Sequence, residues 1–240
     1  MSLLTMMQQV CLELNLSSPS VVISNADNTV KQLLGLSQRE GKELAKNYDW
    51  PVLQTEETIT LTAAVGTYAL ASDWSRFINQ TQWDRTNHWQ LLGPMSPQEY
   101  QWRVSGITIS TPRRRFRIMG STATQIIIDP TPATGETGQI LAYEYISNQW
   151  CKSSGGTGQS AWAADDDTGI ISEDLMGMGI KWRWLKAKGL NYDEEYREYQ
   201  AACDRDFAQS AGAPVLNIGR RARLIVGLTN AAIPETGYGS

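Results

Sequence analysis

RFINQTQWDRTNHWQLLGPMSPQEYQW, residues 76–102, is the stretch that most strongly decides how this chain is interpreted. It combines several tryptophans with a Gly-Pro turn and the tetrapeptide Ser-Pro-Gln-Glu at 96–99. Ser96 is a suitable N-cap, with proline at the first helical position and Glu99 at the third, which predicts a short helix through about Val104. The stretch contains shape-defining residues but no recognisable catalytic set, and this combination indicates a structural or assembly protein.

The residues before this stretch predict two helices. The first begins after Ser2, and its apolar residues from Leu3 to Leu14 recur at spacings of three and four. The second begins near Asp27 with Ser24 or Asn25 as its cap, and it ends at Trp50-Pro51 because proline disfavours a helical residue before it. Small residues in the middle of the second helix would allow another helix to approach closely.

Alternation of apolar and polar residues predicts strands in the centre of the chain. The expected strands are Thr58–Thr62, Gly66–Leu70, Arg115–Met119, Gln125–Asp129 and Gln139–Ser147, separated by turns rich in proline and glycine.

Two more helices are predicted after residue 171. The first is capped by Ser172 and ended by Gly189, and its apolar residues cover more than one face, so we expect burial on two sides. Its basic residues, Arg183 among them, should reach solvent. The last helix starts at a capping box over Asn191–Glu194 and carries an aromatic stripe that begins at Tyr192.

The pattern changes after residue 211, where repeated prolines and glycines exclude a long helix. Arg220-Arg221-Ala222-Arg223 runs directly into Leu224-Ile225-Val226. Fully extended, this tail would reach on the order of 90 Å. An apolar strand on such a tail needs a partner sheet. It can fold back on its own domain or bind another chain, and the sequence does not separate these two outcomes.

These elements predict an α+β fold in which N- and C-terminal helices form a bundle and the β-rich middle is inserted between them. We expect residues 1–50 and 172–211 to form the helical body. Residues 51–171 would form the β-rich insertion, and 212–240 an extended C-terminal tail.

Composition narrows the class of protein. A net charge of −4 in 240 residues makes general nucleic-acid binding a poor expectation. The three cysteines are far apart and lack metal-ligand spacing, so we expect reduced thiols. The N-terminus lacks the features of a signal peptide, and no apolar run has the length of a membrane span.

Three patterns that could carry chemistry are weak. Asp165-Asp166-Asp167 begins no EF-hand, because the twelfth position of that loop is Met176 instead of glutamate. The glycines around Gly156 lack the lysine that a phosphate-binding loop requires. His88 is the only histidine, and no nucleophile elbow accompanies it. We therefore predict no catalytic residue, no cofactor and no metal.

Two surface features stay open at this stage. The cluster Arg113-Arg114-Arg115 beside a strand is either a nucleic-acid contact or, as we prefer, a solvated edge that discourages wrong strand pairing. Exposed tryptophans and tyrosines would serve either as packing or as a sugar-binding platform.

The pattern from Met1 to about Gly212 resembles the head-to-tail adaptor proteins of tailed bacteriophages, the group that includes tail tubular protein A. No single segment is decisive, but their order and spacing agree. The segments that carry the resemblance are LLTMMQQVCLEL, TVKQLLGLSQREGKELAKNYDW, the quoted stretch at 76–102, FRIMG, AYEYISNQW and DLMGMGIKWRWLKAKGLNYDEEYREY.

The resemblance implies a non-enzymatic virion protein of the neck or tail, made in the host bacterial cytoplasm. Such adaptors form a ring, typically dodecameric, between the portal protein and the next tail component, a nozzle or tail tube protein. Genomic DNA passes through the ring's channel without specific binding, and no membrane is involved.

The resemblance also implies where the contacts would lie. The C-terminal tail would contact the portal or a neighbouring copy through Arg220, Arg221, Arg223, Leu224, Ile225 and Val226. Ring formation needs two different complementary faces on each subunit. Our candidates for a subunit interface, with a purely core role as an equal alternative, are Trp83, Trp89, Tyr100, Trp102, Trp182, Arg183 and Trp184.

Two other classes of function compete with the adaptor hypothesis. The first is a carbohydrate-binding or other peripheral structural module of a phage tail, which would use exposed aromatic residues. The second is a hydrolase that uses the acidic residues near Asp165–Asp167, for which we expect no turnover.

Overall fold

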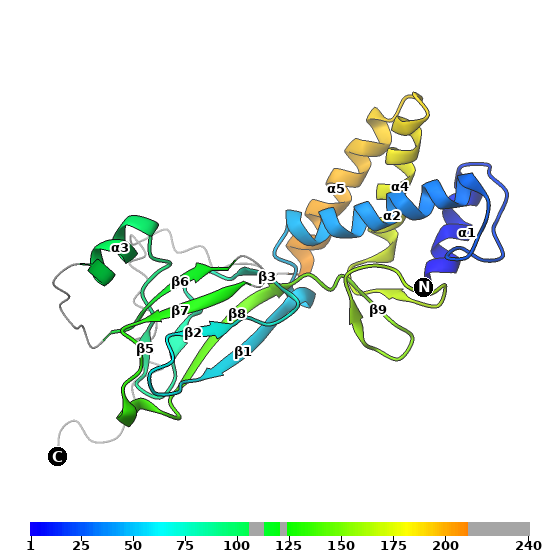
Figure 1. Ribbon diagram of the computed structural model, residues 1–240. Helices are drawn as coiled ribbons and strands as arrows, with labels where there is room; N and C mark the ends of the chain where they lie inside the picture. The colour runs from blue at the N-terminus through cyan, green and yellow to red at the C-terminus, as the bar shows by residue number, and fades with distance from the viewer. Residues whose placement is uncertain (106–112, 121–123, 211–240) are drawn as a thin grey trace, which may run out of the picture.

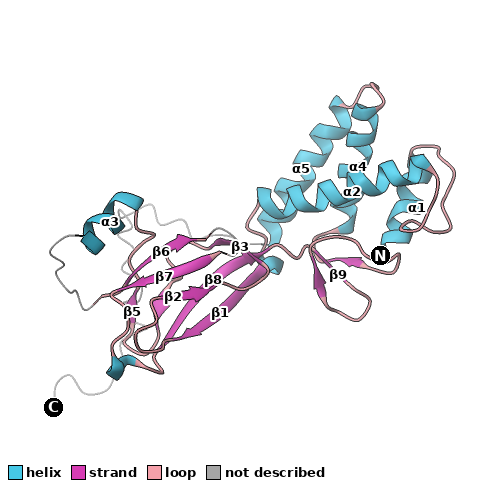
Figure 2. Ribbon diagram, in the orientation of Figure 1, coloured by secondary structure: helices cyan, strands magenta, loops and turns pink. Residues whose placement is uncertain are grey.

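A computed structural model describes residues 1–105, 113–120 and 124–210 and shows an elongated molecule built from two units (Figure 1). Helices from both ends of the described chain meet in one unit, and most of the strands form the other, as Figure 2 shows by colour. The predicted α+β class is confirmed. The tail predicted for 212–240 lies outside the described residues.

The helical unit is organised around one central helix. It contains α1 (Leu3–Glu13), α2 (Asn28–Asn47), α4 (Glu173–Ala187) and α5 (Asp193–Ser210). α4 contacts the other three helices, which confirms its predicted burial on more than one side. In Figure 1 α2 runs across α4 instead of alongside it, and the expected bundle arrangement is not confirmed.

The ends of the helices test the predicted caps and stops. The Ser2 side chain accepts a hydrogen bond at the start of α1, as predicted. α2 is capped by Asp27, whose carboxylate accepts the N–H of Thr29 at 2.8 Å, and not by either residue proposed above. Ser172 stands at the N-cap of α4 but makes no side-chain capping hydrogen bond. Gly189, with φ of +71°, follows the end of α4 as expected.

The β unit contains two antiparallel sheets. In the first, β8 (Ile140–Ser147) pairs along one edge with β1 (Gln54–Thr60). Along its other edge lie β3 (Trp74–Phe77) and then β4 (Trp83–Asp84), which pairs with β5 (Trp89–Gln90). The second sheet has the order β2-β7-β6 and consists of β2 (Thr67–Ala69), β7 (Gln125–Asp129) and β6 (Arg115–Met119).

The two sheets enclose a core of their own. Side chains such as Phe116 and Ile128, which face each other across β6 and β7, are buried with Leu141 and Tyr143 of β8. All five predicted strands are present with ends shifted by a few residues at most, whereas β3, β4 and β5 were not predicted. Those three strands are short and carry no regular alternation. A 3-10 turn precedes the unit at Pro51–Leu53, and another follows β7 at Thr134–Glu136.

The quoted stretch ends in α3 (Pro97–Ser105), the predicted helix. The N–H of Glu99 donates to the Ser96 hydroxyl at 3.1 Å, which confirms the cap. The Glu99 side chain forms an ion pair with Arg115, so the chain uses this glutamate for a tertiary contact.

A small sheet joins the helical unit. It consists of β9 (Cys151–Lys152), β10 (Gly158–Gln159) and β11 (Thr168–Gly169). Trp150, Cys151 and Trp162 belong to the same buried cluster as the helices, separate from the core between the two large sheets. The predicted limits of the β-rich insertion, residues 51 and 171, stay a prediction. Within the described ranges, no helix has the length and apolar character needed to cross a membrane.

Candidate assembly surfaces

Polar contacts attach α3 to the outer face of the second sheet. Arg115 and Arg117 alternate along β6 with the buried Phe116, so their side chains point away from the core. Arg115 pairs with Glu99 of α3, and the Arg117 guanidinium lies 4.7 Å from the centre of the Tyr100 ring. These contacts fix α3 without giving it an apolar core face.

A second ion pair completes the attachment. Arg103 of α3 pairs with Asp129 at the end of β7, and its side chain is 5% exposed. Arg103 is also the buried residue of α3, where an apolar residue would ordinarily stand. The helix is therefore held by charges on its inner side.

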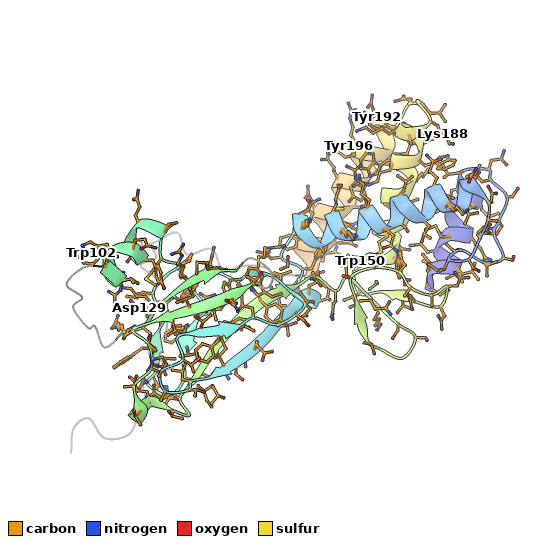
Figure 3. All side chains as sticks on the ribbon, viewed as in Figure 1. Trp102, Asp129, Trp150, Lys188, Tyr192 and Tyr196 are labelled. Carbon is orange, nitrogen blue, oxygen red and sulfur yellow. The ribbon has the colours of Figure 1, made fainter. Side chains whose placement is uncertain are left out.

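The large apolar residues of this region point outward. Trp102 is 65% exposed, Val104 61% and Met119 47%. Figure 3 shows Trp102 at the end of the molecule remote from the helical unit. Trp102 and Val104 are two positions apart, so they project from different sides of α3. Single exposed apolar residues are normal on protein surfaces, but an exposed tryptophan on a helix held by ion pairs is a candidate contact. We call Tyr100, Trp102, Val104 and Met119 the α3 patch.

The other two aromatic candidates of the β unit lie on the hairpin between β4 and β5. Trp89 is 39% exposed, whereas Trp83 is half-buried and donates its indole N–H to the Gln80 carbonyl at 3.2 Å. His88 lies in the turn between them with φ of +59° and is exposed. The structure therefore places these candidates on two separate elements, α3 and the β4–β5 hairpin.

The remaining candidates, Trp182, Arg183 and Trp184, lie inside the helical unit. Their exposed fractions are 7%, 8% and 5%. Trp182 packs against Tyr192, Tyr196 and Tyr199, the aromatic stripe predicted from the sequence. These residues therefore pack within one chain, and little of their surface is exposed for contact with another chain.

Arg183 was expected to reach solvent, and that expectation is wrong. Its guanidinium donates to Glu40 at 2.5 Å and to Glu43 at 2.7 Å, both on α2. Glu40 is fully buried and also accepts the Tyr199 hydroxyl at 2.5 Å. A buried carboxylate requires hydrogen-bond and ion-pair partners to offset its lost hydration. The Glu40 carboxylate in turn keeps the Arg183 guanidinium inside the core.

The small residues of the helices make room for this network. A β-carbon added to Gly179 of α4 would lie 2.2 Å from the Glu40 carboxyl group. One added to Gly41 of α2 would lie 2.3 Å from the ring of Trp150. The predicted close approach is therefore real, although at Gly41 the partner is an indole ring and not a helix.

Burial controls the ionisation of the Glu40 site. Burial raises the pKa of Glu40, while Arg183 and the Tyr199 hydroxyl act in the opposite direction. Burial and the Glu40 carboxylate raise the pKa of Tyr199 far above its ordinary value. Perturbed groups of this kind often mark active sites. Here the carboxyl group is sealed from solvent, so the arrangement is structural.

A similar pair lies in the β unit and corrects a second expectation. Arg114, from the arginine cluster expected at a solvated edge, is buried and contacts Asp84 at 3.2 Å and Glu136 at 2.9 Å. Its guanidinium also donates to Gln139 at 2.9 Å. With Arg115 engaged by Glu99, two members of the cluster serve folding.

A comparison with protein families identifies the chain. Residues 1–227 match the family described as SU10 adaptor protein. The chain belongs to that family. It is accordingly a phage adaptor protein, a structural and non-enzymatic virion component of the neck, with partners at the head-tail junction. A search of the curated proteins found no match.

The family match extends further along the chain than the resemblance stated from the sequence. It runs past Gly212 to residue 227 and therefore includes Arg220–Val226.

The loops that could have suggested chemistry have structural roles in this adaptor. The Asp165 carboxylate accepts the N–H groups of Val22 and Ile23, and buried Asp167 accepts those of Ala163 and Ala164. In the described parts of the chain, no group of three or more His, Cys, Asp and Glu residues is arranged to hold a metal ion.

The three cysteines are free thiols buried in the helical unit of the adaptor, as predicted. Burial raises the pKa of Cys151 to about 12 and that of Cys203 to about 11. Because the thiolate is the reactive form, these side chains act as core residues.

Proposed function

We propose that this adaptor resembles tail tubular protein A in its role and forms a ring between the portal and the tail, extending the DNA channel. The observation that carries the proposal is Trp102 of the α3 patch, a side chain that is 65% exposed on a helix held in place by ion pairs. An isolated subunit gains nothing from holding Trp102 in water, whereas an assembled subunit gains a rigid aromatic anchor.

In this proposal the α3 patch contacts a neighbouring copy or the next tail component, a nozzle or tail tube protein. A ring requires two different faces on each subunit. The β4–β5 hairpin with Trp83 and Trp89 is the second candidate face in the β unit. The three buried candidates of α4 hold that helix in place and do not contact another chain in this proposal. They are Trp182, Arg183 and Trp184.

The copy number and the channel belong to the same proposal. We expect twelve copies, as the resemblance implies. The net charge of −4 per chain supports a channel wall along which DNA moves without sticking, since DNA affinity arises from neutralising phosphates.

Electron microscopy with class averaging tests the ring directly. The protein alone is compared with the protein mixed with the portal from the same genome. We expect an added ring layer on the portal, whose symmetry gives the copy number. A protein that stays monomeric and leaves the portal unchanged would contradict the proposal and favour a carbohydrate-binding or peripheral tail module.

The C-terminal tail is the proposed contact with the portal or a neighbour, through Arg220, Arg221, Arg223 and the apolar run Leu224–Val226. Deleting the residues after Gly212 should leave the described body folded, as measured by circular dichroism, and abolish cosedimentation with the portal. Unchanged cosedimentation of the shortened chain would refute this assignment.

A further inference from the structure

A groove of about 480 Å³ lies between α1, α4 and α5 in the helical unit. The apolar residues beneath it are Met6 and Val10 of α1, Leu175 of α4 and Ala202 of α5, each at most 4% exposed. Its volume falls within the range of sites that bind small molecules or short segments. Met178, which is 40% exposed, stands at its side. Met178 is therefore an apolar side chain that the groove leaves open, and most of the groove's accessible lining is polar.

The rim of the groove is acidic. Its charged groups are Glu13, Glu173, Asp174, Glu195, Glu198 and Asp206 against Lys181, Arg205 and the α-amino group of Met1, which pairs with Glu173. Lys181 lies 3.7 Å from Glu13, and Arg205 lies 3.8 Å from Asp206, so both bases are already engaged. Among the ion pairs of the described residues, none includes Asp174, Glu195 or Glu198. The rim is thus complementary to a segment that carries several positive charges.

The chain contains one segment that matches both properties. Arg220-Arg221-Ala222-Arg223 supplies positive charge, and Leu224-Ile225-Val226 supplies an apolar run directly after it. From Ser210, the last residue of α5, to Arg220 the chain can extend by about 35 Å. The wall of the groove from Glu195 to Asp206 is only about 17 Å long. The segment can therefore turn back along the helix that it follows.

We propose that in the free subunit this groove binds Arg220–Val226 of the same chain. The arginines bind the carboxylates of Asp174, Glu195 and Glu198, for which guanidinium groups are well-shaped donors, and the apolar run packs against Met178. A short tether raises the local concentration of the segment to roughly the millimolar range, which favours the same chain over a second copy.

This binding goes beyond the proposed ring and does not rest on it. It concerns the subunit before assembly, when an uncovered apolar strand would promote wrong association. A tail that later contacts the portal would have to leave the groove first, so the groove would keep the tail out of unwanted contacts until then.

Limited trypsin digestion of the full chain, followed by mass spectrometry, tests the proposal because trypsin cleaves after Arg220, Arg221 and Arg223. The wild-type chain is compared with Glu195→Lys/Glu198→Lys. The matched control is Glu57→Lys, an exposed charge reversal on β1. A synthetic peptide of residues 214–230 gives the cleavage rate of the unbound segment. Thermal unfolding verifies that each variant is folded.

We expect cleavage at these arginines to be slower in the wild-type chain than in the peptide, at every protein concentration. The double reversal should accelerate it by about tenfold, because two ion pairs become repulsive contacts. The control should not change it. Wild-type cleavage as fast as that of the peptide, or insensitive to the double reversal, would overturn the proposal. Protection that grows with protein concentration would also overturn it, by showing that a second copy is the occupant. Portal binding is not measured, so the outcome is independent of the ring.

Discussion

The two units of this adaptor place their tryptophans in opposite ways. In the helical unit Trp150, Trp182 and Trp184 are buried, whereas in the β unit Trp89 and Trp102 are exposed. The difference lies in what holds the backbone beneath each ring. α4 is fixed by aromatic and apolar side chains around one buried ion pair, whereas α3 is fixed mainly by ion pairs and leaves Trp102 and Val104 exposed. Aromatic content alone therefore does not locate an interface.

The largest expected effect comes from removing the buried cation of the helical unit. Arg183→Met leaves Glu40 without its cation, and breaking such a buried pair costs about 3–5 kcal/mol of unfolding free energy. Urea denaturation measures this loss. Arg39→Met is the matched control, because that side chain is 67% exposed and should change stability by less than about 1 kcal/mol. Equal losses in both variants would show that the buried Arg183 contributes no more to stability than the exposed Arg39.

A second substitution separates assembly from folding. Trp102→Ala should leave thermal unfolding nearly unchanged, since the side chain is 65% exposed. It should weaken association with neck partners by about 2 kcal/mol or more, as expected for a tryptophan anchor. Trp182→Ala, the control in the helical unit, should instead destabilise the fold by about 3–5 kcal/mol. Electron microscopy of ring formation and cosedimentation with the next tail component measure association, and calorimetry measures stability. Normal assembly of Trp102→Ala would contradict the role of the α3 patch.

A third pair of variants tests the packing of α2. Gly41→Ala places a β-carbon against the Trp150 ring and should cost about 1–3 kcal/mol. Gly35→Ala lies on the same helix, where nothing stands within 4 Å of the new atom. It should stabilise the helix by up to about 1 kcal/mol through helix propensity. Chemical denaturation of both proteins gives the signs, and a stabilising Gly41→Ala would show that this contact is looser than described.

The smallest expected effect concerns the attachment of α3. Glu99→Gln removes one partly exposed ion pair with Arg115, worth about 0.2–1 kcal/mol. Global stability should barely change, but hydrogen exchange over residues 97–105 should become faster and should become less sensitive to salt than in the wild type. Identical exchange rates in the two proteins would show that the remaining contacts of Arg103 and Arg117 suffice.

Much of this architecture follows from local sequence signals. The periodicity of α1 and α2, the cap at Ser96 and the stop at Gly189 each depend on neighbouring residues, and the structure agrees with them. The strands with regular alternation were found for the same reason. β3 to β5 were missed because they are short and take their geometry from pairing with β8 and with each other.

The candidate site depends more than the fold does on contacts between residues far apart in the chain, which local sequence patterns do not predict. Arg183 looks like any surface base until Glu40, 143 positions earlier, is found beside it. One signal was present, because Glu40 lies beside Gly41 on the buried side of α2, where a lone acid implies a partner. For Arg103 and Asp129 no comparable signal exists, since the two belong to different elements and their neighbours are ordinary.

The central claim is that the α3 patch is an assembly contact and that the tryptophans of α4 are core. Hydrogen–deuterium exchange of the protein, free and bound to its portal and tail partners, tests this claim most directly. We predict that peptides covering Pro97–Ser105 become protected on assembly, while peptides of Glu173–Ala187 are protected in both states and do not change. Protection that rises over α4 and stays constant over α3 would contradict the account.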